Sequence, residues 1–139
     1  MTPDLETLRR FFASAPFMAD LGIEPFAAGE GRVATRLVLQ PRHLQHTGVV
    51  HAGVIGAMAD HTMGAAAQTM APADHWILTA EYKVNLLRAG RGERLECEAR
   101  VVKPGRQVSF TEAQVFAFDG AARALVATAS ATMAVTKAA

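Results

Sequence analysis

One aspartate, Asp60, stands alone in a long uncharged stretch of the chain. No other Lys, Arg, Asp or Glu occurs between His43 and Ala73, and residues 49–70 are mostly Val, Ile, Met, Ala and Gly. Burying a carboxylate among such side chains is costly unless a partner compensates its charge. A carboxylate retained there can serve as a general base for water or as a nucleophile. Asp60 is therefore the first candidate for chemistry.

A second chemical group lies at the start of the helix that carries Asp60. Residues 51–69 are apolar or small on nearly every side, which predicts a long, enclosed helix beginning at His51. The backbone N–H groups of Ala52 and Gly53 would then be unpaired. Together with the positive end of the helix dipole, they can polarise a carbonyl group and stabilise the oxyanion that forms on it.

These two groups cannot act on one carbonyl carbon from a single helix. Asp60 lies eight residues after Ala52, which is roughly 12 Å along an α-helix. If both groups serve one substrate, two copies of the helix must run antiparallel across a two-fold axis. Composition also favours association, because half of the 139 residues are hydrophobic and only 19% are charged. We expect a homodimer or a homotetramer.

The order of the other elements predicts an α+β fold. Apolar residues at helical spacing predict a short N-terminal helix over residues 4–15, capped by Thr2 or Asp4 and ended by Pro16. Strands are predicted at residues 21–28, 32–39, 76–87, 94–103, 107–119 and 122–135, with an irregular loop at 41–50. Short turns between the last four strands favour an antiparallel meander. We expect one domain over residues 1–139, a single sheet curling around the apolar helix.

The stretch HTGVVHAGVIGAMADHTMG, residues 46–64, resembles the helix signature of hotdog-fold acyl-CoA thioesterases of the PaaI type. In that family a loop Asn, Gln or His precedes a G-x-x-H-G-G turn, and an acidic residue follows nine positions after the His. Gly48, His51, Gly53 and Asp60 match at that spacing. The resemblance implies a hotdog fold, an antiparallel sheet wrapped around one long central helix, and hydrolysis of an acyl-CoA at a dimer interface.

The resemblance also implies roles for individual residues. Asp60 would be the catalytic carboxylate, and Ala52, where the family usually has the first Gly of its pair, would supply the oxyanion-hole N–H. Gln45 falls where the family has its loop Asn or Gln, which contacts the substrate carbonyl or the attacking water. Thr79, on the strand after the helix, matches a position where some members use Ser or Thr to hold that water near the carboxylate.

Other residues would bind the substrate. His46 could replace Gln45 in contacting the thioester. His51 and Gly53 would shape the turn at the helix start, where we expect His51 to orient the turn rather than to act as a base. A turn that resembles the basic turn meeting the CoA phosphates in the family contains Lys103, Gly105 and Arg106.

No metal or redox cofactor is expected, because a thioester is already activated and water is the co-substrate. A metal site drawn from His43, His46, His51 and Asp60 matches no common zinc spacing. The chain has no G-x-S-x-G motif, so a nucleophile-elbow hydrolase is excluded. Two alternatives remain: a non-catalytic acyl-CoA sensor that uses the same pocket, and a hydratase or dehydratase, which typically places a His with the acid.

Charge and composition limit the other possibilities. A formal net charge of +1 argues against a nucleic-acid binder. Asp60, His61 and Gln68 interrupt the best candidate for a membrane span, and residues 1–10 lack the apolar core of a signal peptide. Cys97 has no partner for a disulfide within the chain and is expected in a buried strand. We expect a cytoplasmic protein that acts on an aromatic or a short- to medium-chain acyl group.

Overall fold

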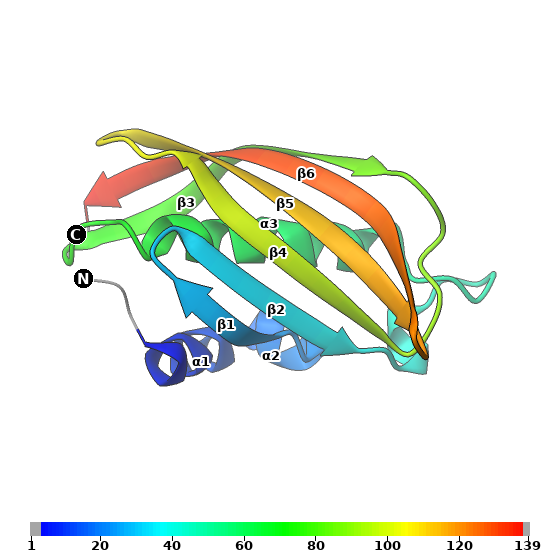
Figure 1. The fold of residues 1–139 in the computed structure, drawn as a ribbon. Helices are drawn as coiled ribbons and strands as arrows, with labels where there is room; N and C mark the ends of the chain where they lie inside the picture. Colours follow the sequence, from blue (N-terminus) through cyan, green and yellow to red (C-terminus); the bar gives the residue numbers. More distant parts are fainter. Residues whose placement is uncertain (1–3, 138–139) are drawn as a thin grey trace.

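A six-stranded antiparallel sheet forms most of the molecule (Figure 1). The computed structural model describes residues 4–137. Along the sheet the strands follow the order β1-β2-β4-β5-β6-β3. Their bounds are β1 Glu24–Gly29, β2 Arg32–Val38, β3 His75–Leu86, β4 Arg94–Lys103, β5 Val108–Asp119 and β6 Ala122–Lys137. All six predicted strands are present, and β1 and β2 form the predicted hairpin.

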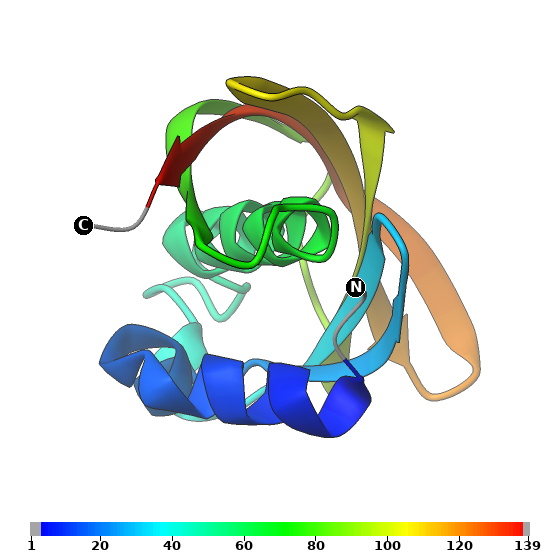
Figure 2. The same cartoon turned by 90° about the vertical axis from the view of Figure 1, so that its left-hand side faces the viewer.

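The long helix α3, Ala52–Gln68, lies in the concave side of this sheet (Figure 2). Its apolar side chains pack against the strands, and Met58 and Met63 are fully buried. A hydrogen bond of 2.8 Å between the hydroxyls of Thr62 and Thr35 joins α3 to β2. This is the predicted architecture, a curved sheet around one central helix.

Two short helices precede the sheet, where one was predicted. Asp4 caps α1, Leu5–Ser14, by accepting a hydrogen bond of 2.8 Å from the Thr7 backbone N–H, while the alternative cap Thr2 lies outside the described residues. Pro16 does end α1, but it also begins α2, Pro16–Leu21. Proline is well suited to the first position of a helix, because the N–H that it lacks has no partner there.

The predicted meander of the last four strands is wrong for β3. Strands β4, β5 and β6 follow one another in the sheet, but β3 pairs with β6 and forms the far edge. Turn residues at 90–92 mark where a strand ends, yet they do not determine which strand it pairs with. The connection over residues 87–93 instead carries the chain from one edge to the middle of the sheet. In its course the Leu87 N–H donates to the Val126 carbonyl, at 2.8 Å.

Cys97 is buried in β4, as predicted, together with Leu95 and Ala99. Within the predicted loop 41–50, a short 3₁₀ turn at Pro41–His43 buries His43.

No helix among residues 4–137 is both long and apolar enough to cross a bilayer.

Burial should make the Cys97 thiol unreactive. The thiol is fully buried, and burial raises its pKa to about 12, so almost no reactive thiolate forms at neutral pH. We expect a chromogenic disulfide reagent to detect no thiol in the native protein and one thiol per chain in urea. Rapid reaction of the native protein would contradict the buried position.

Candidate functional site

One stripe of α3 is not covered by the rest of the chain. The sheet buries one side of the helix (Figure 2), and α1 contacts it at His61 through Phe11 and Phe12. The positions that stay partly or fully exposed recur about one helical turn apart: Ala52, Gly53, Ala57, Asp60, His61, Gly64 and Gln68. The predicted enclosure of α3 on nearly every side is therefore wrong for a single chain. Asp60 is half-buried rather than enclosed, because its position falls on this stripe.

Asp60 and Thr79 form a hydrogen-bonded pair on this stripe. The Thr79 hydroxyl donates to Asp60 Oδ1 at 2.7 Å, and Thr79 faces α3 from β3, opposite the buried Met133. Both residues line a small pocket of about 90 Å³ between α1, α3 and β3. A hydroxyl that donates to one carboxylate oxygen fixes the orientation of the carboxylate and leaves its second oxygen for other partners.

The start of α3 differs in one respect from the prediction. His51 is the N-cap, and its Nδ1 accepts a hydrogen bond of 2.8 Å from the Gly53 N–H. A Cβ atom on residue 53 would lie 2.9 Å from that nitrogen, so the cap requires glycine. Of the two N–H groups predicted to be free, only that of Ala52 lacks a hydrogen-bond partner within residues 4–137. His51 thus orients the helix start, as predicted.

A cleft of about 480 Å³ opens at this end of α3. Ala52 and Gln45 line it from the helix start and the preceding loop, and Arg88 and Leu87 line it from the connection after β3. The loop folds back because the Gln45 N–H donates to the Val49 carbonyl, at 2.8 Å, while Gly48 adopts a φ of +87°. The structure therefore brings Gln45 and Ala52 to the same cleft.

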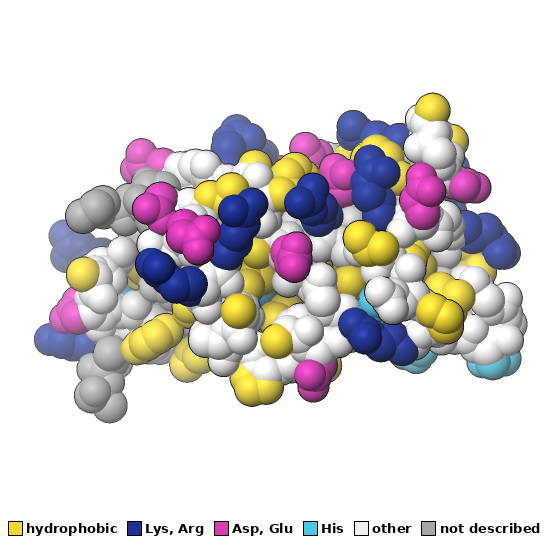
Figure 3. Space-filling view, turned by 90° about the horizontal axis from the view of Figure 1, so that it is seen from below, with side chains coloured by type: hydrophobic (Ala, Val, Ile, Leu, Met, Phe, Trp, Pro, Cys, Tyr) yellow, Lys and Arg dark blue, Asp and Glu magenta, His cyan; other side chains and the backbone are white. Residues whose placement is uncertain are grey.

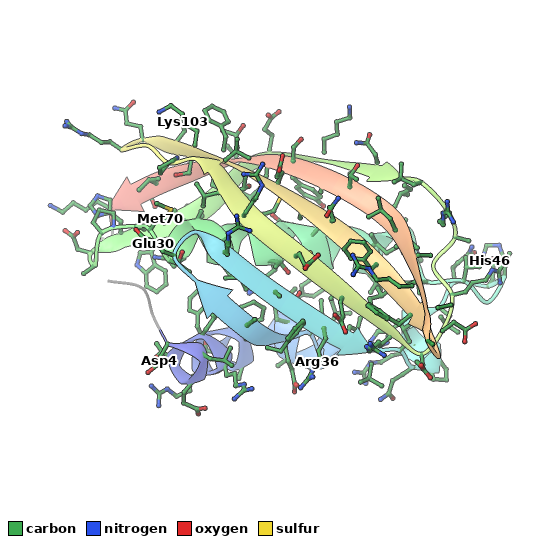
Figure 4. All side chains as sticks on the ribbon, in the orientation of Figure 1. Asp4, Glu30, Arg36, His46, Met70 and Lys103 are labelled. Atoms are coloured by element: carbon green, nitrogen blue, oxygen red, sulfur yellow. The ribbon has the colours of Figure 1, made fainter. Side chains whose placement is uncertain are left out.

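His46 does not join this cleft. Its side chain is exposed at the tip of the loop (Figure 4). Between Gln45 and His46, the two candidates for contact with a thioester, the single chain therefore brings only Gln45 to the helix start.

The predicted basic turn lies at the opposite end of the molecule. In Figure 4, Lys103 and His46 stand at opposite ends, and Met70, just after α3, lies toward the Lys103 end. Gly105 and Arg106 continue this exposed turn. A Cβ atom on residue 105 would lie 2.2 Å from the Val108 carbonyl oxygen, so the tight turn requires glycine there. Within one chain, this turn and the start of α3 do not meet.

His61 is a residue at the site to which the sequence assigned no role. Its ring stacks at 6.3 Å on Phe11 and meets Phe12 edge-on at 4.5 Å, both from α1. Within the described residues its Nε2 is buried without a hydrogen-bond partner. Burial lowers the pKa of His61, and the charge of the neighbouring Asp60 opposes this effect. The side chain is therefore a neutral contact between α1 and α3.

Acid should weaken this contact. The unfolded chain protonates His61 near its ordinary pKa of 6.5, whereas the folded chain resists protonation. The stability that neutral His61 contributes is complete above pH 6.5 and is lost as the pH falls toward the lower folded-state pKa. We expect His61→Phe to reduce the loss of stability between pH 7.5 and pH 5, measured by urea unfolding at each pH. An equal acid-dependent loss in both proteins would contradict the assignment.

The structure does not support the metal site that the sequence analysis disfavoured. His43 is buried, with Nδ1 accepting from the Gln40 N–H at 3.0 Å and Nε2 lying 2.8 Å from the Leu21 carbonyl oxygen, to which it must donate. No group of three His, Cys, Asp or Glu side chains suited to a metal ion occurs in the described part of the chain.

Positively and negatively charged side chains are interspersed on the face of the molecule that Figure 3 shows, which is the lower face in the view of Figure 1.

Comparisons with known proteins agree with this geometry. The family model described as Thioesterase superfamily matches residues 47–124. A thioesterase family protein from Silicibacter pomeroyi is 33% identical and superposes with a TM-score of 0.91, covering 95% of this chain and 97% of its own. No match was found among curated proteins.

Other solved structures show the same fold at lower identity. A Haemophilus influenzae thioesterase is 23% identical with a TM-score of 0.88, covering 99% of this chain and 93% of its own. A mutant thioesterase from Pseudomonas aeruginosa is 24% identical with a TM-score of 0.87, covering 99% and 96%. The curved sheet around α3 is thus a hotdog fold, as the sequence predicted.

Proposed function

Since this chain belongs to the thioesterase superfamily, we propose that it hydrolyses an acyl-CoA thioester to the carboxylic acid and free CoA. The observation that carries the proposal is the pair formed by Thr79 and Asp60 on the open stripe of α3, at 2.7 Å, on the same helix as the free N–H of Ala52. One group suits attack on a carbonyl carbon, and the other suits stabilisation of its oxygen.

The two groups require two chains. Asp60 follows Ala52 by eight residues of regular helix, or roughly 12 Å along the axis, whereas reacting groups must lie within about 3 to 3.5 Å of the atoms they act on. In the proposed dimer, a two-fold axis places α3 of one protomer antiparallel to α3 of its partner. Asp60 of each then faces Ala52 of the other, which gives two equivalent active sites.

The edge of the sheet supports this arrangement. Strand β3 has twelve residues and pairs with β6 on one side, so its other side offers backbone groups for pairing. Leu78, Tyr82 and Leu86 on β3 are exposed in the single chain. Long edge strands with exposed apolar side chains are sites of association. Pairing of β3 with its copy would bring the two stripes of α3 together.

In the proposed reaction, the partner's Ala52 N–H and helix dipole polarise the thioester carbonyl. Asp60 takes a proton from water as the water oxygen attacks the carbonyl carbon. The carbon–sulfur bond then breaks, and the CoA sulfur leaves as a thiolate that accepts a proton. Alternatively, the Asp60 carboxylate attacks directly and gives an acyl-enzyme anhydride, which water hydrolyses. Either route consumes one water and needs no metal or redox cofactor.

Thr79 would hold the Asp60 carboxylate or the water in place, and Gln45 would contact the thioester carbonyl or the water from the cleft at the helix start. The basic turn around Lys103 and Arg106 would meet the CoA phosphates. In an antiparallel dimer this turn lies at the end where the partner's α3 begins, which supports that assignment.

We propose a cytoplasmic enzyme, since Cys97 has no disulfide partner within the chain.

The alternatives have less support. A hydratase would use a His together with the acid, but His61, although next to Asp60 in sequence, packs between Phe11 and Phe12 with its Nε2 buried. A non-catalytic sensor does not require the hydrogen bond that orients the carboxylate.

Removing the Asp60 charge should abolish hydrolysis. We expect Asp60→Asn to lower kcat by about 10²- to 10⁴-fold, the usual contribution of a general base, and Thr79→Val to lower it by about tenfold through loss of one hydrogen bond to a carboxylate. Release of CoA from acyl-CoAs, followed with a thiol reagent, measures both. Asp74→Asn is the matched control, because Asp74 is exposed and lies before β3. Unchanged activity in Asp60→Asn would refute the proposal.

A proline substitution can remove the Ala52 N–H that we propose as the oxyanion donor. Ala52→Pro deletes the N–H, and proline is suited to the first helical position. His51 already has the extended backbone, with φ −64° and ψ 135°, that precedes a proline. We expect Ala52→Pro to fold normally by circular dichroism and to lose about 10²- to 10³-fold in kcat, as when one oxyanion-hole donor is removed.

Mixed dimers then test whether each site is shared between chains. Dimers of one Asp60→Asn chain and one Ala52→Pro chain contain one intact site, formed by Asp60 and Ala52 from different chains. Random exchange of equal amounts should restore about a quarter of the wild-type activity from two nearly inactive proteins. If each chain carried a complete site, the mixture would stay inactive. Light scattering should confirm that both variants remain dimers.

A further inference from the structure

We propose that Phe11 of α1 forms one side wall of the acyl-binding pocket and restricts the enzyme to short aliphatic acyl groups. This inference rests on the proposed thioesterase function. It identifies a specificity-determining residue outside the α3 signature and chooses among the acyl groups that the sequence left open.

The pocket begins at the catalytic pair. Asp60 and Thr79 line it together with Phe11, His61, Gly64 and Ile77. If the CoA arm of the substrate approaches from the partner's cleft, its acyl group must extend away from that cleft, and this pocket is the space that borders Asp60. Along α3 it extends past Gly64, where a Cβ atom would have no neighbour within 4 Å.

The far end of the pocket is closed by Gln68. Its side-chain amide donates to the His75 carbonyl at 3.0 Å, and its amide oxygen accepts from the Ile77 N–H at 3.1 Å. Both bonds join α3 to the start of β3. A substrate chain cannot pass this point without breaking hydrogen bonds between the helix and the sheet.

Phe11 closes the open side. Its ring stacks at 6.3 Å on His61 and at 6.3 Å on Trp76, so it spans from α3 to β3. The neighbouring α1 residues Leu8 and Phe12 are both only 2% exposed and anchor the helix in the core. Phe11 is therefore a wall held by a packed helix, and its ring replaces the space that a longer acyl group would need.

The volume sets the size of the acyl group. The pocket holds about 90 Å³. A cavity of about 150 Å³ accommodates benzene, which has six non-hydrogen atoms. The pocket therefore has room for about three non-hydrogen atoms beyond the carbonyl carbon, which fits a butyryl group and excludes a phenyl ring. Of the acyl groups that the sequence left open, the structure favours the short aliphatic ones over the aromatic ones.

A panel of acetyl-, butyryl-, hexanoyl-, octanoyl- and phenylacetyl-CoA tests the proposal. We expect kcat/KM of the wild type to be highest for butyryl-CoA and at least about tenfold lower for octanoyl- and phenylacetyl-CoA, since one misfitting methylene in an apolar pocket already changes kcat/KM by about 10- to 200-fold. Phe11→Ala should move the optimum to the longer or aromatic groups. Phe11→Leu keeps an apolar contact for α1 and should give a smaller shift in the same direction.

Phe17→Ala is the matched control, because Phe17 is 63% exposed on the adjacent α2; its substrate profile should equal that of the wild type. The inference is overturned if the wild type prefers octanoyl- or phenylacetyl-CoA, or if folded Phe11→Ala and Phe11→Leu keep the wild-type profile. Absence of hydrolysis of every acyl-CoA by the wild type would instead refute the proposed function.

Discussion

The rigidity of α3 is the constraint on which the rest of the structure depends. An α-helix rises about 1.5 Å per residue, so its N–H terminus and a carboxylate two turns along it are held apart by a fixed distance. The sheet buries one side of α3 and α1 covers part of another, which leaves one stripe on which both groups are accessible. In the dimer that we propose, each α3 supplies one of the two groups to each active site, and a second copy of the helix supplies the other.

The placement of β3 at the edge of the sheet links the chemistry to association. In a simple meander, β3 would lie beside β4, inside the sheet. Pairing with β6 instead brings Thr79 against the middle of α3, where it donates to Asp60. The same placement leaves one side of β3 without a neighbour in the chain. One choice of strand order therefore orients the carboxylate and also provides the surface through which we propose that the dimer forms.

Aromatic side chains of α1 bound one side of the candidate site. Phe12 is buried against His61, and Phe11 extends from His61 to Trp76 on β3. Hydrogen bonds of Gln68 close the same pocket at its far end. The groups that we propose as catalytic come from α3 and β3, whereas one wall of the pocket beside them comes from a helix outside the α3 signature. If this pocket binds the acyl group, as we propose, substitutions in α1 can change its size while Asp60 keeps its hydrogen bond to Thr79.

Much of this could be predicted from the sequence, because the relevant signals are local. Alternation of apolar residues predicted the strands, Cys97 was assigned correctly to a buried strand, and the spacing of His51, Gly53 and Asp60 placed the two chemical groups on one helix. The second helix at Pro16 was missed, since proline reads equally well as the end of one helix and as the first residue of the next.

The features that the sequence did not predict involve residues far apart in the chain. The pairing of β3 with β6, the hydrogen bond from Thr79 to Asp60 and the contacts of Phe11 with His61 and Trp76 each join separate elements that meet only when the chain folds. A turn signal marks the end of a strand but carries no information about its neighbour, because strand pairing is set by the burial of the whole sheet face. Local patterns in the sequence thus predicted every strand and the long helix α3, and the packing of these elements determined which of their residues meet.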